Sequence, residues 1–144
     1  MRIEKTLSII KPDIVKKNQI GEIINFLEKK GLKVVGMKMV HLTIQKAKRF
    51  YQEHQNRPFF EGMVKFMCSS PVVVMCLEGE NAIKLNREIM GATNPHEAKE
   101  GTIRKIYGKN IEANAIHGSD SEEAAEQEIN FFLKANYSIN KIKN

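Results

Sequence analysis

The sequence has little cysteine and no tryptophan, with 2 Cys among 144 residues. Cys68 and Cys76 do not form a Cys-x-x-Cys pair, and Cys76 lies in the apolar run 72–77, where a thiol packs as a small hydrophobic side chain. A disulfide framework and a thiol-based metal site are therefore not expected. This cysteine usage favours a reducing compartment.

Long apolar segments are also missing. No run of about 18 apolar residues occurs, so we expect no membrane-spanning helix. The apolar stretch near the N-terminus is too short to be the core of a signal peptide. We therefore expect a cytoplasmic protein. At this length a chain can bury a core without disulfides or metal, and no repeat or linker divides it, so we predict a single domain spanning residues 1–144.

The common phosphate-binding and metal-binding motifs are absent too. The chain has no Gly-x-x-x-x-Gly-Lys-Ser/Thr stretch and no Gly-x-Gly-x-x-Gly, so a bound nucleotide would not lie in a P-loop or a Rossmann turn. The four histidines lack the close His/Cys spacings of zinc sites. We expect no metal bound by protein ligands alone.

Positive charge is in excess, with 23 Lys and Arg against 17 Asp and Glu, a formal net charge of +6. Such a charge favours an anionic partner, either nucleic acid or a polyphosphate. Many of the lysines stand singly or in pairs and do not form one long basic block, which is more typical of a solvated surface. Nucleic acid is therefore the less favoured partner.

The hydrophobic pattern predicts four strands that alternate with helices. Strands are predicted at 6–10, at 32–42 with Gly36 as a candidate bulge, at 72–77 with both faces buried, and after Asn114. Helices are predicted around 20–27, as a hairpin between 43 and 67, at 80–90, and from Ser121 onward. Two β-α-β halves joined by helices indicate an α/β sandwich whose helices cover the sheet.

Two segments lie outside this regular pattern. Residues 92–113 are rich in Gly, Asn, Pro, Thr and charge, and only 102–104 has the character of a helix start. A loop of this length inside a compact domain is usually functional. Residues 135–144 are predicted to form a polar tail on the surface.

His117 is the first candidate for chemistry, because it follows a short apolar approach and precedes strand-breaking and helix-capping residues. It is therefore expected at the end of an element, where a side chain can meet a substrate. Glu128 falls beside the apolar stripe of the next helix and needs a partner, for which His117 is a candidate. Simpler alternatives stay open: His117 as a packed or solvated residue, and Ser119 with Glu122 as a capping box.

Polar and aromatic residues elsewhere could complete a site for a phosphorylated, flat ligand. Lys11 stands at the carboxyl end of the first strand, while Phe59 precedes an apolar stripe and is poorly accounted for by a core. An exposed Phe can stack on a flat ligand. Cations and neutral hydrogen-bonding groups that could orient a triphosphate are Lys11, Arg87, Arg104, Thr93 and Asn114.

With these residues in place, the sequence resembles the nucleoside diphosphate kinases over nearly its whole length. The motifs that carry the resemblance are Thr6-Leu7-Ser8-Ile9-Ile10-Lys11-Pro12-Asp13, Arg57-Pro58-Phe59-Phe60, Gly91-Ala92-Thr93-Asn94-Pro95, Gly101-Thr102-Ile103-Arg104 and Asn114-Ala115-Ile116-His117-Gly118-Ser119-Asp120-Ser121. The last is the family's active-site signature. The resemblance implies a ferredoxin-like sandwich with a four-stranded antiparallel sheet.

The resemblance also implies a role for each candidate residue. His117 would accept the γ-phosphate of ATP or another nucleoside triphosphate and pass it to a nucleoside diphosphate in a ping-pong reaction. Glu128 would hold the proton of the other ring nitrogen, and Ser119 would assist. The remaining roles are a phosphate clamp of Lys11, Arg87, Thr93 and Arg104, Tyr51 close to the transferred group, Lys11 and Asn114 at the sugar, and Phe59 stacked on the base.

Further expectations follow from the same resemblance. Mg²⁺ should arrive on the nucleotide phosphates, with few or no direct protein ligands. The protein should be a homo-oligomer, a tetramer or hexamer built from dimers. The chain departs from the family at Ile106, where an acidic residue is frequent, and it matches loosely at 105–112 and from Ala135 onward.

Two rival hypotheses remain at this level. A basic ferredoxin-like module could use Phe59 and surface lysines to hold single-stranded nucleic acid, although no aromatic pair on adjacent strands supports this. Alternatively, the basic residues are surface solubilisers, and Arg87 and Arg104 are ordinary ion-pair partners.

Overall fold

The sheet consists of four strands: β1 (Ile3–Ile10), β2 (Lys33–Val40), β3 (Val72–Glu80) and β4 (Ile116–Gly118). These come from a computed structural model that describes residues 2–133. The strand order is β2-β3-β1-β4, and every neighbouring pair is antiparallel. Since β1 and β2 both run opposite to β3, which lies between them, they form a split β-α-β unit. The predicted sandwich is confirmed, including the antiparallel sheet that the resemblance implied.

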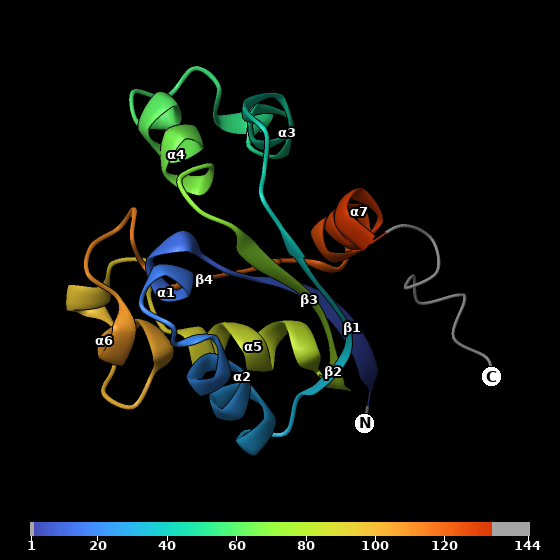
Figure 1. Cartoon of the computed structure of the whole chain (residues 1–144). Coiled ribbons are helices and arrows are strands. Elements are labelled where there is room, and N and C mark those ends of the chain that lie inside the picture. Colours follow the sequence, from blue (N-terminus) through green and yellow to red (C-terminus); the bar gives the residue numbers. More distant parts are fainter. Residues whose placement is uncertain (1, 134–144) are drawn as a thin grey trace.

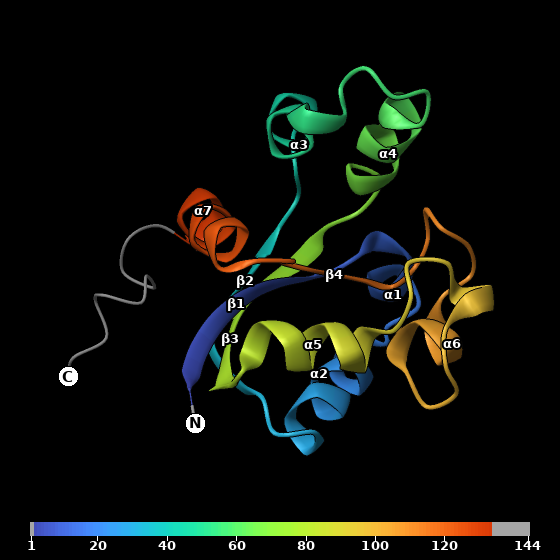
Figure 2. The same ribbon diagram turned by 180° about the vertical axis from the view of Figure 1, so that it is seen from behind.

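Helices connect the strands and cover both faces of the sheet (Figure 1, Figure 2). After β1 come α1 (Pro12–Lys16) and α2 (Ile20–Lys29), and the predicted hairpin between β2 and β3 contains α3 (Ile44–Phe50), the short 3₁₀ turn η1 (Gln52–His54) and α4 (Phe60–Met67). The second half contains α5 (Ala82–Met90), η2 (Pro95–Glu97), α6 (Ile103–Tyr107) and α7 (Glu122–Leu133). Among the described residues, no helix is both long and apolar enough to cross a bilayer.

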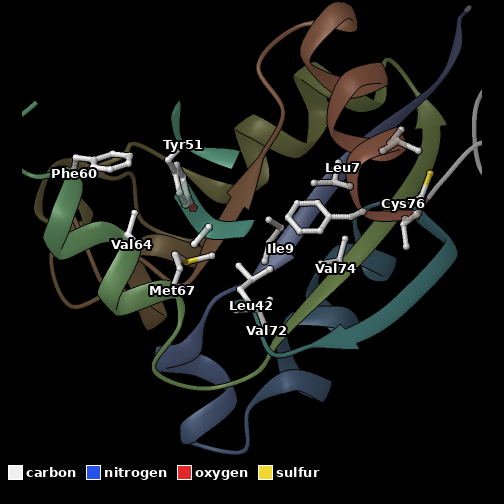
Figure 3. Close-up of a cluster of buried hydrophobic side chains, with 14 residues drawn as sticks. Leu7, Ile9, Leu42, Tyr51, Phe60, Val64, Met67, Val72, Val74 and Cys76 are labelled. Carbon is white, nitrogen blue, oxygen red and sulfur yellow. The ribbon is translucent and has the colours of Figure 1, made fainter. Parts of the chain in front are cut away.

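The core has two layers because successive residues of β3 point to opposite faces of the sheet. Val72, Val74 and Cys76 pack with residues of α3, α4 and α7, a layer shown in Figure 3. Val73, Met75 and Leu77 belong to the second layer, which includes residues of α1, α2, α5 and α6. All of residues 72–77 are buried, as their unbroken apolar character predicts.

The strands and the loop region differ in detail from the predictions. The register of β2 against β3 shifts between Val34 and Gly36, which confirms the predicted bulge. β3 extends to Glu80 because its last residues pair with β1, although their sequence is polar. The segment 92–113 contains η2 and α6, so it is more ordered than predicted. The tail predicted at 135–144 lies outside the described residues.

The start of α7 corrects one sequence interpretation. The hydroxyl of Ser121 accepts a hydrogen bond from the Ala124 backbone N–H at 3.0 Å, so Ser121 caps this helix. The Ser119 hydroxyl instead donates a hydrogen bond to Glu128 Oε1. The interpretation of Ser119 and Glu122 as a capping box is therefore wrong, because the Ser119 hydroxyl binds Glu128 and does not cap the helix.

Candidate active site

His117 is the central residue of the three-residue strand β4, where it pairs with Ile9 of β1. Its neighbours Ile116 and Gly118 are buried, whereas the imidazole is 24% exposed. The imidazole and the ring of Phe50 in α3 form a T-shaped pair, with the ring centroids 5.3 Å apart. The imidazole is therefore held by packing on one side and accessible on another.

Glu128 of α7 lies directly behind the imidazole. Its Oε1 atom is 2.9 Å from His117 Nε2 and accepts a hydrogen bond from the Ser119 hydroxyl at 2.7 Å. A carboxylate is an acceptor, so this contact places the ring proton on Nε2 and leaves a lone pair on Nδ1. Within the described residues, Nε2 makes the ring's only hydrogen bond.

A tight turn immediately before β4 sets the direction in which His117 enters the sheet. Ala115 has a φ of 79°, and the Ile116 N–H donates to the Asn114 carbonyl at 2.9 Å, which closes a γ-turn. Such a φ costs about 1–3 kcal/mol for a residue with a side chain and needs external support. Asp13 Oδ2 supplies it by accepting the Ala115 N–H at 3.1 Å. Sequence reasoning missed this role of Asp13.

Lys11, Asn114 and Thr93 form a connected polar chain. Lys11 Nζ donates to Asn114 Oδ1 at 2.8 Å, and Asn114 Nδ2 donates to the Thr93 carbonyl at 3.0 Å. Burial lowers the pKa of the Lys11 ammonium to about 8, although the charge of Asp13 opposes this effect. Lys11 is thus a largely desolvated cation that lacks a carboxylate in direct contact among the described residues.

Arg104 connects the end of α5 with β4. Its Nη1 donates to the Gly91 carbonyl at 3.0 Å, and its Nη2 donates to the Ile116 carbonyl at 2.7 Å. Burial lowers the pKa of the guanidinium to about 10, helped by the charge of Arg87, so the group stays protonated at neutral pH. Neither contact is an ion pair, so the interpretation of Arg104 as an ordinary ion-pair partner finds no support.

One cleft of 870 Å³ brings most of the candidate residues together. Its size suits a small organic ligand. The predicted residues that line it are Lys11, Tyr51, Phe59, Arg87, Thr93, Arg104, Asn114 and His117. The two remaining candidates, Ser119 and Glu128, do not line this cleft and lie behind the imidazole.

The aromatic residues take different places around the cleft. Tyr51 is buried, and burial together with the charge of Glu128 raises the pKa of its phenol, so the hydroxyl remains a proton donor. Phe59 is 49% exposed and is not part of either buried core layer. Ile111, which sequence reasoning missed, is 59% exposed and lines the same cleft. An isolated apolar residue in a polar segment was the available signal.

The described residues do not form a chelating cluster. Within 2–133, no group of three or more His, Cys, Asp or Glu side chains is placed to hold a metal ion. The side-chain donors that line the cleft are three cations, two hydroxyls, two imidazoles and one amide, and the cations suit an anionic ligand.

Comparisons with known proteins agree with this arrangement. The family model for nucleoside diphosphate kinase matches residues 4–137. The chain is 56% identical to a nucleoside diphosphate kinase of Coxiella burnetii over 142 residues, which is 99% of each protein. It is 59% identical to that of Nitrosococcus oceani over 135 residues, or 94% of each.

Solved structures give the same result. The enzyme of Halobacterium salinarum, determined in complex with CDP, superposes with a TM-score of 0.90 at 43% identity, covering 94% of this chain and 90% of that one. The enzyme of Aquifex aeolicus gives a TM-score of 0.89 at 43% identity, covering 93% and 97%.

The fold, the cation-lined cleft and these relatives define a phosphotransferase that acts on nucleotides. The chain belongs to the nucleoside diphosphate kinase family, and its activity is phosphoryl transfer from a nucleoside triphosphate to a nucleoside diphosphate.

Proposed function

We propose that His117 carries the phosphoryl group between the two nucleotides. The observation that carries this proposal is the contact of Glu128 with Nε2, which leaves Nδ1 as the nucleophilic nitrogen of the ring. A neutral imidazole needs no additional base to attack phosphorus. Ser119 fixes the carboxylate by donating to the same oxygen.

The reaction then consists of two matched displacements. The Nδ1 lone pair forms a bond to the γ-phosphorus while the bond from that phosphorus to the bridging oxygen breaks, and the nucleoside diphosphate leaves with the bonding electrons. A terminal β-phosphate oxygen of the second diphosphate next attacks the phosphohistidine, and the N–P electrons return to the ring. Glu128 stabilises the positive charge that the ring carries in between.

The phosphates are held by the cations of the cleft. Lys11 and Arg104 approach them from the buried floor, and Arg87 approaches from the exposed side of α5. Thr93 and Tyr51 add neutral donors near the transferred group. Because Arg104 also binds the carbonyl next to His117, it couples phosphate binding to the position of the nucleophile.

The nucleoside occupies the outer part of the cleft. Asn114 and Lys11 are within reach of the same part of the ligand, and we assign them to the ribose hydroxyls. Phe59 and Ile111 present exposed apolar surface, and we assign them to the two faces of the base. Stacking accepts any base, which gives broad nucleotide specificity.

Mg²⁺ fits this site as an ion bound to the phosphates of the nucleotide. The described residues offer cations for the phosphates and no chelating cluster for an ion. When bound, Mg²⁺ neutralises phosphate charge and orients the chain of phosphates. The side chains of this protein hold the phosphate oxygens that the ion leaves free.

The nucleophile is tested by replacing single histidines. His117→Ala should reduce transfer from ATP to a diphosphate by at least about 10⁴-fold, because the covalent intermediate is lost. His96→Ala is the control, since His96 is exposed and lies outside the cleft lining. Wild-type initial rates should give parallel double-reciprocal lines; transfer by the His117→Ala protein at the wild-type rate would refute the role.

We also propose that the chain acts as a single-domain subunit of a cytoplasmic homo-oligomer, a tetramer or hexamer. Its nucleotide substrates are cytoplasmic metabolites, and β2 is an edge strand with Met37 and Met39 more than half exposed, a surface that a second copy can cover. Light scattering gives the mass directly. A monomer at micromolar concentration would contradict this part of the proposal.

A further inference from the structure

Glu112 is a carboxylate at the outer wall of the cleft, in a position where an anion has no evident use. It follows Ile111 in the segment between α6 and β4, and both residues line the cleft. Its Oε2 atom lies 3.1 Å from the place that a Cβ on Gly62 of α4 would occupy. Figures 1 and 2 show this segment rising toward α4. The side chain therefore reaches from this segment to α4.

This carboxylate has no partner in the described part of the chain. It accepts no hydrogen bond and forms no ion pair there, although it is exposed and free to do so. It lies near enough to Lys11 to act on it: burial lowers the pKa of Lys11 to about 8, and the charges of Asp13 and Glu112 oppose that effect. Glu112 is thus an unused acceptor inside the ligand-binding space.

The charge of Glu112 determines which part of a nucleotide it can meet. A carboxylate repels phosphates, so the phosphates belong with Arg87, Arg104 and Lys11. The opposite end of the ligand is the base. If Phe59 and Ile111 hold the two faces of the base, then Glu112, adjacent to Ile111 and directed at α4, lies along its rim.

We propose that Glu112 reads the hydrogen-bonding edge of the base and makes guanine the preferred base. The inference rests on the proposed function, which places the base between Phe59 and Ile111. Guanine presents its N1–H and its 2-amino group side by side, and the two oxygens of a carboxylate accept both. Adenine and cytosine present one amino group each, and uracil presents one N–H between two repelling carbonyls. The predicted order of diphosphate acceptors is guanine first, then adenine and cytosine, and uracil last.

The test compares GDP with inosine diphosphate, which keeps N1–H and lacks only the 2-amino group. For the wild-type protein we expect kcat/KM to be about 10-fold higher for GDP than for inosine diphosphate, the value of one charge-assisted hydrogen bond at a partly exposed site. In Glu112→Gln this ratio should fall to about 1–2, because one terminal atom of the amide is an NH₂ donor, which cannot accept a hydrogen bond from the 2-amino group. Glu61→Gln is the matched control, since Glu61 is exposed on α4 beside Gly62 but does not line the cleft.

Two results would overturn the inference. One is a GDP to inosine diphosphate ratio that Glu112→Gln leaves unchanged. The other is an equal change for all acceptors, which would mean that Glu112 acts on the phosphates through its charge. Calorimetric dissociation constants of both nucleotides for the His117→Ala protein measure base reading without catalysis. The ratio of these two dissociation constants can therefore be measured even if the phosphohistidine mechanism is wrong, so the two failures can be told apart.

Discussion

The two nitrogens of His117 have separate tasks, because a single carboxylate oxygen occupies one of them. Glu128 Oε1 accepts from Nε2 at 2.9 Å and from Ser119 at 2.7 Å, so the carboxylate cannot rotate away without losing both contacts. The arrangement selects the tautomer in which Nδ1 is nucleophilic. It would also stabilise the cationic ring of the proposed phosphohistidine.

Removing only the charge of Glu128 tests this division. Glu128→Gln should lower kcat by about 10²-fold and change KM little, because the amide cannot hold the ring proton as a carboxylate does. Glu126→Gln, exposed on the same helix, should leave both constants unchanged. A Glu128→Gln protein with wild-type kcat, or with its loss confined to KM, would show that the carboxylate only packs against the ring.

The lowered pKa of Lys11 predicts opposite effects of pH on activity and on stability. Burial lowers its pKa in the folded protein from 10.5 to about 8. In the proposed role of Lys11, the neutral amine that forms as the pH rises through 8 no longer neutralises a phosphate, so kcat/KM should fall there. Between about 8 and 10.5 the unfolded chain binds the additional proton, so this group should make the folded state more stable as the pH rises.

Bound phosphates should make the pH profile of kcat differ from that of kcat/KM. Their charge raises the pKa of Lys11 in the complex, so kcat should hold to a higher pH than kcat/KM does. Initial rates between about pH 6.5 and 10, with urea unfolding at the same pH values, measure both effects. A kcat/KM that stays flat to pH 10 would contradict the assignment of Lys11 to the phosphates.

The candidate residues could be predicted from the sequence more readily than the contacts that they make. The motif around His117 and the exposure expected for Phe59 followed from residue types and order. The support of Ala115 by Asp13 did not, because it joins residues 102 positions apart. Ser119 was ambiguous for a physical reason: a hydroxyl before a helix can cap it or serve another acceptor, and only the position of Glu128 decides.

At the scale of elements, β4, which carries His117, packs closely against α5, which carries Arg87. A Cβ on Gly118 would overlap Asn86 Nδ2 and would lie 2.6 Å from Met90 Sδ, so a side chain at position 118 would force these two buried side chains of α5 to move. Asn86 is fully buried. The proposed nucleophile His117 and the proposed phosphate-binding residue Arg87 thus lie on two elements that meet at this contact.

Gly118→Ala should therefore displace the side chains of Asn86 and Met90 on α5 and disturb the packing of this helix on β4. We expect a loss of about 1–3 kcal/mol in the free energy of unfolding, the usual cost of overpacking, and a fall in kcat as Arg87 moves away. Gly21→Ala is the matched control, because nothing lies within 4 Å of its Cβ position in α2, and it should be neutral or stabilising. Urea unfolding measures both; equal stability of the two variants would disprove the packing argument.

Elements with a strong hydrophobic period were predictable, and those defined by pairing were not. The helices around 20–27 and 80–90 were found because their apolar residues recur at three to four positions. The segment 92–113 was predicted as mostly loop, since η2 and α6 are too short to show a period. The three residues of β4 form a strand only because β1 pairs with them.

At the scale of the whole molecule, the cleft collects residues from segments far apart in the sequence. Lys11 follows β1, Phe59 precedes α4, Arg87 belongs to α5 and His117 to β4. The fold class followed from alternating strands and helices, but the antiparallel order rested on the family resemblance. Local periodicity contains no information about which strands become neighbours.

The positive charge of the whole chain should assist the capture of nucleotides. With a net charge of +6 and a cation-lined cleft, kcat/KM should fall roughly 3–10-fold as KCl rises from about 50 to 300 mM, while kcat changes little. Initial rates at limiting and saturating diphosphate separate the two constants. A kcat/KM that is independent of salt would show that the positive charge is only surface solvation.

The most direct measurement is the fate of the γ-phosphate when no acceptor is present. The protein incubated with γ-labelled ATP should retain label that is acid-labile and alkali-stable on a peptide containing His117, and unlabelled GDP should remove this label as GTP. The His117→Ala protein should retain none. Absence of label on the active wild-type enzyme, or label that a diphosphate cannot discharge, would contradict phosphoryl transfer through this imidazole.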